Sequence, residues 1–234
     1  MRDDARIAFA AHALAASPLF RALPPERCDI VARALLTARY RKGQVIFQQG
    51  DDGDAMYLVE SGLVKISAES MAGQEAILTE LRTGETFGEL ALLDGVPRSA
   101  TATALADTVT LRLPRRAFDE LLDTDALFPR RILESLAHEL RRATHHVGEL
   151  HFLDLPGRLA ARFARMARDA DPGSAVEVHL GHHYSQSELA AMIGGTRQSV
   201  NRHLGELVAE GLIRIEREDI VVTDVAALER RSEW

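Results

Sequence analysis

One fifteen-residue segment carries an acid, a base and small residues at a spacing that could bind a phosphorylated sugar. The segment is FGELALLDGVPRSAT, residues 87–101. Gly88 permits close approach of a backbone or ligand, and the residues after it can begin a short helix whose N–H groups face an anion. Arg98 can fork onto a phosphate, Glu89 can accept hydrogen bonds from ribose hydroxyl groups, and Ser99 adds a hydroxyl donor. The alternative is an exposed Glu–Arg ion pair in a loop, which would contribute little to stability.

A second candidate site lies nearer the C-terminus, where a turn separates two helix starts. Residues 185–188, SQSE, form a capping-box pattern, and Gly194-Gly195 provides the turn. Thr196 is a natural N-cap for the next helix, whose apolar residues face inward and leave polar side chains outward near its N-terminal end. This arrangement predicts a helix-turn-helix that enters the major groove of DNA; a helical hairpin with an exposed polar face is the alternative.

Arginine can pair bidentately with guanine and glutamine with adenine, and hydroxyl groups near helix N-termini can contact phosphates. The candidate DNA contacts are Ser185, Ser187, Thr196, Arg197, Gln198, Ser199, Asn201 and Arg202.

The hydrophobic period changes along the chain and predicts the elements that position these sites. Residues 1–35 show helical spacing, whereas residues 43–114 show a period of two and a glycine about every ten residues. That pattern is typical of a β-sandwich or jelly roll. After Gly211, residues 212–216 and 219–223 predict a β-hairpin with a tight turn at Arg217-Glu218, so the second site is predicted to be a winged helix-turn-helix.

A long helix is predicted from about residue 126 to residue 152. Its apolar residues are spaced 3, 4, 3, 4 and 3 apart, which is the a/d seam of a coiled coil and predicts a parallel dimer. A helix packed on its own barrel is the alternative, although such a helix usually has a wider apolar stripe. The sequence Asp154-Leu155-Pro156-Gly157 then breaks the pattern and marks a domain boundary. The seam residues are Leu133, Leu136, Leu140, Ala143, Val147 and Leu150.

The charge balance argues against a general polyanion binder but allows a local DNA-reading surface. The 234 residues include 28 Lys and Arg and 35 Asp and Glu, a net charge of −7. From Asp154 onward there are 10 Arg and 13 Asp and Glu, so that region also has a net charge of 10 − 13 = −3. Specific DNA binding would therefore depend on how a few arginines are arranged.

Other features of the composition limit the class of protein. The single cysteine, Cys28, excludes an intramolecular disulfide framework and a four-cysteine metal site. No stretch approaches about 18 uninterrupted apolar residues, so no transmembrane span is predicted. Asp3 and Asp4 lie where a signal peptide would carry positive charge. We therefore expect a cytoplasmic protein without membrane partners.

The first segment resembles the phosphate-binding cassette of cyclic-nucleotide-binding domains. With the long helix and the winged helix-turn-helix behind it, residues 18–225 resemble the catabolite-activator (CRP/FNR) family of bacterial transcription regulators. The resemblance implies that Glu89 binds the ribose 2′-OH and that Arg98 and Ser99 hold the cyclic phosphate, with backbone groups of Gly88 and Leu90 nearby. It also implies that the base lies against the long helix, near Ala143 and Thr144, with a contribution from the other subunit.

The resemblance further implies a fold class of α+β in three parts: a cyclic-nucleotide-binding β jelly roll with N-terminal helices over residues 1–125, a dimerisation helix over 126–153 and a winged helix-turn-helix over 154–234. Such a protein would be an allosteric homodimer that binds a pseudo-palindromic double-stranded DNA operator and contacts RNA polymerase. Gln198 stands where many members have Glu, which implies a changed base preference at one operator position.

Cyclic AMP is the effector that the resemblance favours. Cyclic-AMP receptors of the family can carry a Thr-Ser pair where this chain has Ala143 and Thr144, and a hydroxyl at the position of Ser99 can favour guanine. Cyclic GMP, cyclic di-GMP and regulation without a nucleotide therefore stay as alternatives.

An enzyme and a metal site are both disfavoured. The sequence has no nucleophile–base pair, metal-ligand spacing or glycine-rich phosphate loop, so we expect no catalytic residue and no metal. An iron–sulfur cluster would need several cysteines. Haem bound by histidines such as His145 and His146 is the remaining alternative, which the intact Glu89 and Arg98 disfavour.

Overall fold

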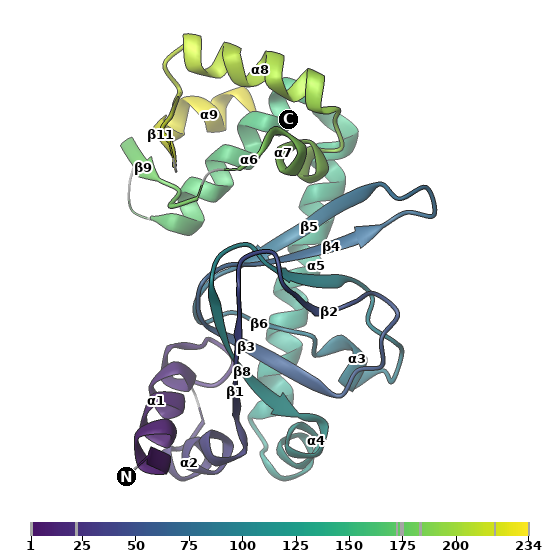
Figure 1. Cartoon of the computed structure of the whole chain (residues 1–234), viewed down its shortest axis with the longest axis vertical. Helices are drawn as coiled ribbons and strands as arrows, with labels where there is room; N and C mark the ends of the chain where they lie inside the picture. The colour runs from purple at the N-terminus through teal and green to yellow at the C-terminus, as the bar shows by residue number, and fades with distance from the viewer. Residues whose placement is uncertain are drawn as a thin grey trace. The chain divides into compact units, whose positions relative to one another are not determined.

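The computed structural model describes residues 2–21, 23–171, 173, 176–182, 184–217 and 219–233. Helices and strands are arranged in two compact units, residues 1–139 and 140–234 (Figure 1). The division falls inside one long helix, α5, Phe128–Phe152. The predicted division at residues 126 and 154 into three functional parts stays a prediction.

The first unit contains the strands that the period of two predicted over residues 43–114, and one earlier strand, β1, that lies before this range. In the part of this unit that the structure describes, they form two four-stranded antiparallel sheets, with strand orders β1-β8-β3-β6 and β2-β7-β4-β5. This confirms a β-rich N-terminal domain. The strands are β1 (Leu36–Tyr40), β2 (Val45–Phe47), β3 (Ala55–Ser61), β4 (Val64–Glu69), β5 (Glu75–Leu81), β6 (Thr86–Phe87), β7 (Thr101–Ala104) and β8 (Thr108–Pro114).

Helices pack against one face of this β structure. Their buried residues form one cluster with residues of β3 and β8, in which Phe128 is stacked on Phe20 and edge-on to Phe118. A second cluster, inside the sheets, contains Tyr57 and Phe87. The helices of this unit are α1 (Arg2–Ala16), α2 (Pro25–Ala34), α3 (Leu90–Leu93), α4 (Arg115–Thr124) and the first half of α5.

The start and end of α5 follow from two aspartates. The predicted start at residue 126 is wrong by two residues, because the Asp125 carboxylate accepts hydrogen bonds from the backbone N–H groups of Leu127 and Phe128, both at 2.9 Å. The helix ends at Phe152. Asp154 then caps the next helix by accepting from Gly157 N at 2.9 Å, so the predicted break does end the long helix.

The second unit is a small helical domain with one sheet. The predicted hairpin is confirmed as β10 and β11, although Glu218 of its turn lies outside the described residues. A third strand, β9, pairs antiparallel with β11 and was missed, because its short VEVH sequence gives a weak signal. The elements are α6 (Leu155–Ala170), β9 (Val176–His179), α7 (Gln186–Ile193), α8 (Arg197–Ala209), β10 (Ile213–Ile215), β11 (Ile220–Asp224) and α9 (Val225–Arg231).

Candidate functional site

The first candidate segment forms the short helix α3 and the loops on either side of it. Gly88 precedes the helix with φ +82°, a conformation that favours glycine. A side chain there would also be blocked, because its Cβ would lie 2.7 Å from Nη1 of Arg98. The chain therefore approaches itself closely at Gly88, with the Arg98 side chain directly alongside.

Arg98 is almost completely buried, with 4% of its surface exposed. Its Nη1 donates to the carbonyl oxygen of Gly88 at 2.5 Å, and its Nη2 donates to that of Ala55 at 2.7 Å. The guanidinium carbon lies 4.3 Å from the centre of the Phe47 ring. The nearest carboxylate is that of Asp54, at 3.7 Å from Nη2. The alternative of an exposed Glu–Arg ion pair therefore does not describe Arg98, which is held by two backbone carbonyls and an aromatic face.

Two side-chain atoms of this segment are buried and have no hydrogen-bond partner among the described residues. They are Oε2 of Glu89 and Nε of Arg98. Burial raises the pKa of Glu89, and the carboxylate of Glu139 on α5 raises it further, whereas Arg98 lowers it. Burial also lowers the pKa of Arg98. Because buried polar groups almost always have a partner, this pair of atoms indicates a ligand that both donates and accepts hydrogen bonds.

The second candidate site has the local geometry that its sequence predicted. Ser185 caps α7 by accepting from Glu188 N, and the Glu188 side chain accepts from Ser185 N in return, which completes a capping box. Gly194 ends α7 in the left-handed conformation. Thr196 then caps α8 by accepting from Ser199 N at 3.2 Å.

The inner and outer faces of α8 are as predicted except at Val208, which helical spacing placed on the inner face but which is 41% exposed near the end of the helix. Val200, Leu204 and Leu207 are buried, whereas Arg197, Gln198, Asn201 and Arg202 are exposed. The side chain of Arg158 on α6 donates to the last carbonyl of α7, that of Ile193, at 3.0 Å. The pair of helices is thus fixed on its inner side and presents a polar, arginine-bearing outer side.

Comparisons with known proteins now decide the family. A model of the cyclic nucleotide-binding domain matches residues 37–125, and a model of the Crp-like helix-turn-helix domain matches residues 157–231. The cyclic AMP receptor protein of Thermus thermophilus is 37% identical over 213 residues, covering 91% of this chain and 95% of that protein. The chain belongs to the CRP/FNR family.

Solved structures agree with this assignment. A CRP/FNR-family transcriptional regulator from Thermus thermophilus is 28% identical, with a TM-score of 0.69, and the match covers 85% of this chain and 99% of that one. The c-di-GMP responsive global regulator CLP of Xanthomonas campestris is 26% identical, with a TM-score of 0.67, covering 81% and 94%. The chain is therefore a DNA-binding transcription regulator with a cyclic-nucleotide-binding domain, and its family consists of regulators rather than enzymes.

The remaining residues proposed for the nucleotide are more exposed than Glu89 and Arg98. Leu90 and Ser99 lie at the surface of the cassette, which we define as residues 87–101. Ala143 and Thr144 are exposed on the half of α5 that belongs to the second unit, and Thr144 Oγ1 donates to Leu140 O at 2.9 Å. Contacts of all these residues with a nucleotide stay predictions.

Arg115 lies outside the cassette but contacts it, and sequence reasoning missed this residue. From the first position of α4, its guanidinium donates to the carbonyl oxygens of Ala91 at 2.8 Å, Leu92 at 3.1 Å and Gly53 at 2.8 Å. A Cβ on Gly53 would lie 2.3 Å from that of Ala91, so the loop before β3 packs directly on α3. Arg115 therefore fastens three segments together. Nothing in its neighbouring sequence signals this, because the carbonyls lie 23, 24 and 62 residues away.

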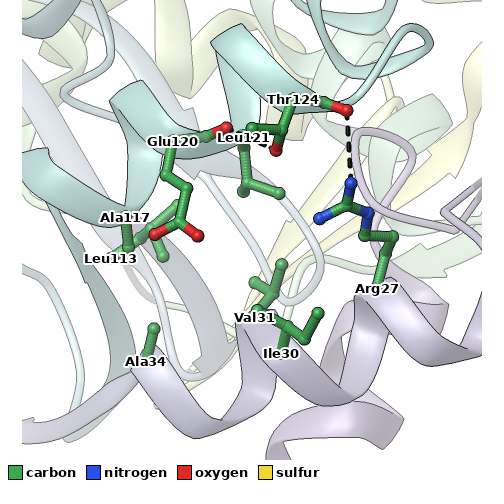
Figure 2. Close-up of a pocket in the computed structure, with 9 residues that line it drawn as sticks. All are labelled: Arg27, Ile30, Val31, Ala34, Leu113, Ala117, Glu120, Leu121 and Thr124. Atoms are coloured by element: carbon green, nitrogen blue, oxygen red, sulfur yellow. Dashed lines mark hydrogen bonds between the residues drawn. The ribbon is translucent and has the colours of Figure 1, made fainter.

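A pocket between α2 and α4 lies in the same unit but does not suit a nucleotide (Figure 2). Its volume is about 40 Å³, whereas sites for drug-sized ligands span several hundred Å³. Arg27 crosses one end and donates to Thr124 O at 3.2 Å. The pocket is lined mainly by Ile30, Val31, Ala34, Leu113, Ala117 and Leu121.

The histidines considered for haem contact a carboxylate. Nδ1 of His145 and Nδ1 of His146 each lie 3.2 Å from an oxygen of the buried Glu149, which also accepts from Arg165 on α6. Across the described ranges of the chain, no group of three or more His, Cys, Asp or Glu side chains is placed to hold a metal. In those same ranges, no helix is long and apolar enough to span a membrane.

Proposed function

We propose that cyclic AMP is the effector of this regulator and that the chain works as a homodimer on a pseudo-palindromic operator. The observation that carries the effector proposal is the unpartnered, buried pair formed by Glu89 Oε2 and Arg98 Nε. A cyclic nucleotide offers a ribose hydroxyl, which can donate to a carboxylate, and a phosphate, which can accept from a guanidinium. The same ligand would thus provide partners for both atoms.

The other contacts of Arg98 suggest how the ligand would act. In this structure its Nη1 and Nη2 donate to the carbonyl oxygens of Gly88 and Ala55. A phosphate bound at the free Nε and a neighbouring N–H of the guanidinium would draw the group toward the ligand and away from these carbonyls. Nucleotide binding would therefore loosen or rearrange the link between the cassette and β3. Ser99, the backbone of Gly88 and Leu90, and Ala143 and Thr144 on α5 would complete the site.

The dimer proposal rests on the exposed apolar side chains of α5. Leu133, Leu140 and Val147 are 66%, 69% and 65% exposed, at positions that the a/d pattern assigns to one seam. Exposed large apolar residues in a regular pattern are typical of an interface. A second copy of the same helix would cover them, and sedimentation of the full chain reports that association directly.

On DNA, the two recognition helices α8 of a dimer would enter successive major grooves, about 34 Å apart. Arg197, Gln198, Asn201 and Arg202 would contact base edges, and Ser185, Ser187, Thr196 and Ser199 would contact phosphates or support the helix start. We also expect a contact with RNA polymerase, as for an activator or repressor bound at a promoter. Nucleotide would act by binding the DNA-competent arrangement of the dimer more tightly than the other arrangement.

Titration calorimetry with cyclic AMP, cyclic GMP and cyclic di-GMP tests the effector. We expect the tightest binding for cyclic AMP, and a loss of affinity of at least tenfold in Arg98→Ala and in Glu89→Ala, since removing one side of a buried charge-assisted contact costs about 2–5 kcal/mol. Arg116→Ala is the matched control, because Arg116 is an exposed arginine on α4. Wild-type affinity in both cassette variants would refute the site.

Cyclic di-GMP is the second candidate because the Xanthomonas regulator described above responds to it and is 26% identical to this chain. Tighter binding of cyclic di-GMP than of cyclic AMP in the same titration would replace the first proposal with this one. Tightest binding of cyclic GMP would instead point to the hydroxyl of Ser99. Specific DNA binding that needs none of the three would identify a regulator that works without a nucleotide.

A further inference from the structure

The first residue of α7, Gln186, links the two helices of the DNA-binding motif through its side-chain amide. Its Nε2 donates to Oδ1 of Asn201 at 2.7 Å, and its Oε1 accepts from Nε of Arg197 at 3.4 Å. Asn201 and Arg197 both lie in the first turns of α8 and are exposed. One half-buried amide therefore contacts two of the side chains that are proposed to reach DNA bases.

The contact with Asn201 determines which of its amide atoms is left for DNA. An asparagine that recognises adenine bidentately uses its carbonyl oxygen to accept from N6 and its amino group to donate to N7. Here one of the two lone pairs of Asn201 Oδ1 accepts from Gln186, which turns that oxygen toward the start of α7, whereas both hydrogens of the Nδ2 group remain available. Guanine offers two acceptors in the major groove, O6 and N7, whereas adenine offers one acceptor and one donor.

We propose that Gln186 is a specificity-determining residue that positions Asn201 and Arg197 rather than contacting DNA itself. By holding Oδ1, it makes Asn201 a hydrogen-bond donor toward the major groove and disfavours adenine at the base pair that Asn201 contacts. By accepting from Nε of Arg197, it leaves the two terminal nitrogens of that guanidinium for a guanine. The inference rests on the proposed placement of α8 in the major groove.

The competing role for Gln186 is a direct contact with a DNA phosphate, and the two roles differ in what they change. A phosphate contact contributes equally to every sequence. Its loss weakens all complexes alike and does not alter which bases are preferred. Loss of a positioning residue changes the preferred base at one position and leaves the dependence of affinity on salt as it was.

Selection of binding sites from a random DNA library, with the full-length chain and cyclic AMP, tests the proposal. In Gln186→Ala, Oδ1 of Asn201 is freed, and we expect the adenine-to-guanine ratio at one symmetric operator position to rise on the order of tenfold, since a good bidentate pair discriminates by 1–3 kcal/mol. The salt slope of operator affinity should not change. In an Asn201→Ala background, Gln186→Ala should alter the ratio no further. Ser187→Ala, a proposed phosphate contact one residue along α7, should instead weaken all sequences alike.

Three outcomes separate failure of this inference from failure of the proposed function. An unchanged base preference in Gln186→Ala, while Arg202→Ala relaxes the preference at its own position, overturns the inference and leaves α8 as the recognition helix. Uniform weakening with a smaller salt slope also overturns it, in favour of the phosphate contact. If the wild-type chain selects no sequence, or if Arg202→Ala selects the wild-type sequence unchanged, then the proposed recognition helix itself is wrong.

Discussion

Glu89 is a residue of the proposed ligand site that is expected to lower the stability of the ligand-free protein. Its carboxylate is buried, one oxygen has no partner among the described residues, and a second acid, Glu139, lies close enough to raise its pKa. An ionised group in such surroundings is costly unless a ligand donates to it. The sequence predicted that Glu89 belongs to the site, but not this cost, because Glu139 lies 50 residues further along on a different element.

Glu89→Gln is therefore expected to stabilise the ligand-free protein at neutral pH while weakening nucleotide binding. A carboxyl group whose pKa is raised on folding binds more protons in the folded state, so the stability of the wild type falls as pH rises from the ordinary glutamate pKa through the raised value. Glutamine does not titrate, so the variant does not lose stability from this position over that pH range. The stability advantage of the variant should thus be smallest near pH 4, grow as pH rises and then become constant.

Urea unfolding at several pH values between about 4 and 7.5 measures this difference. Glu120→Gln is the matched control, because Glu120 is an exposed glutamate on α4. If Glu89→Gln has the same gain in free energy of unfolding over the wild type at every pH, or no gain at any pH, then the proposed cost of ionising Glu89 is contradicted.

At the scale of elements, Arg115 is one of the residues that connect the cassette to the rest of its domain. It joins α3, the loop before β3 and the start of α4 through three carbonyl oxygens. If α3 moved on nucleotide binding, Arg115 would therefore transmit the movement to α4. This helix packs beside the start of α5 in the same core. Arg115 is thus a positioning residue and does not itself need to touch the nucleotide.

Arg115→Ala is expected to lower the free energy of unfolding by about 2–3 kcal/mol, because it leaves several partly buried carbonyls without their charged donor. Nucleotide affinity should fall as well, and differential scanning fluorimetry with and without cyclic AMP measures both effects. In the control Arg116→Ala, the same removal of a positive charge should change neither. A destabilised Arg115→Ala protein that binds cyclic AMP with wild-type affinity would limit Arg115 to a structural role.

The elements that were predicted well are those whose signals are local. The capping box at Ser185 and the N-cap at Thr196 each depend on residues within one helix, and the structure contains both. The predicted seam on α5 is exposed at most of its positions, but Leu136 packs against the core of the first unit. The features that were missed depend on pairing between distant segments. Strand β9 is fixed by β11, more than 40 residues away, and Arg98 is held by the carbonyl of Ala55, 43 residues before it.

For the whole molecule, the net charge of −7 sets how DNA binding can be controlled. Affinity for arbitrary DNA sequences comes mainly from phosphate contacts and depends steeply on salt. A regulator whose DNA-binding region is itself acidic has little of this general attraction. Several of its arginines are also engaged with carboxylates, since Arg168 pairs with Glu229, Arg214 with Glu177 and Arg231 with Glu210. Under the proposed function, binding would therefore depend on the few exposed side chains of α8, and a change in their arrangement within the proposed dimer would switch it.

Such a switch has a quantitative consequence that links its two sites. If cyclic AMP tightens operator binding by some factor, then operator DNA must tighten cyclic AMP binding by the same factor, and typical couplings are 5- to 150-fold. We expect calorimetric titration of cyclic AMP into the protein–operator complex to show this gain relative to free protein, and fluorescence anisotropy of labelled operator to give the matching value. Arg202→Ala should weaken the specific DNA contact, so at the same DNA concentration the operator should raise cyclic AMP affinity by a smaller factor than in the wild type. The affinity of the free variant for cyclic AMP should equal the wild-type value. If operator DNA leaves cyclic AMP affinity unchanged, then cyclic AMP is not the ligand that controls this protein on DNA, even if it occupies the cassette.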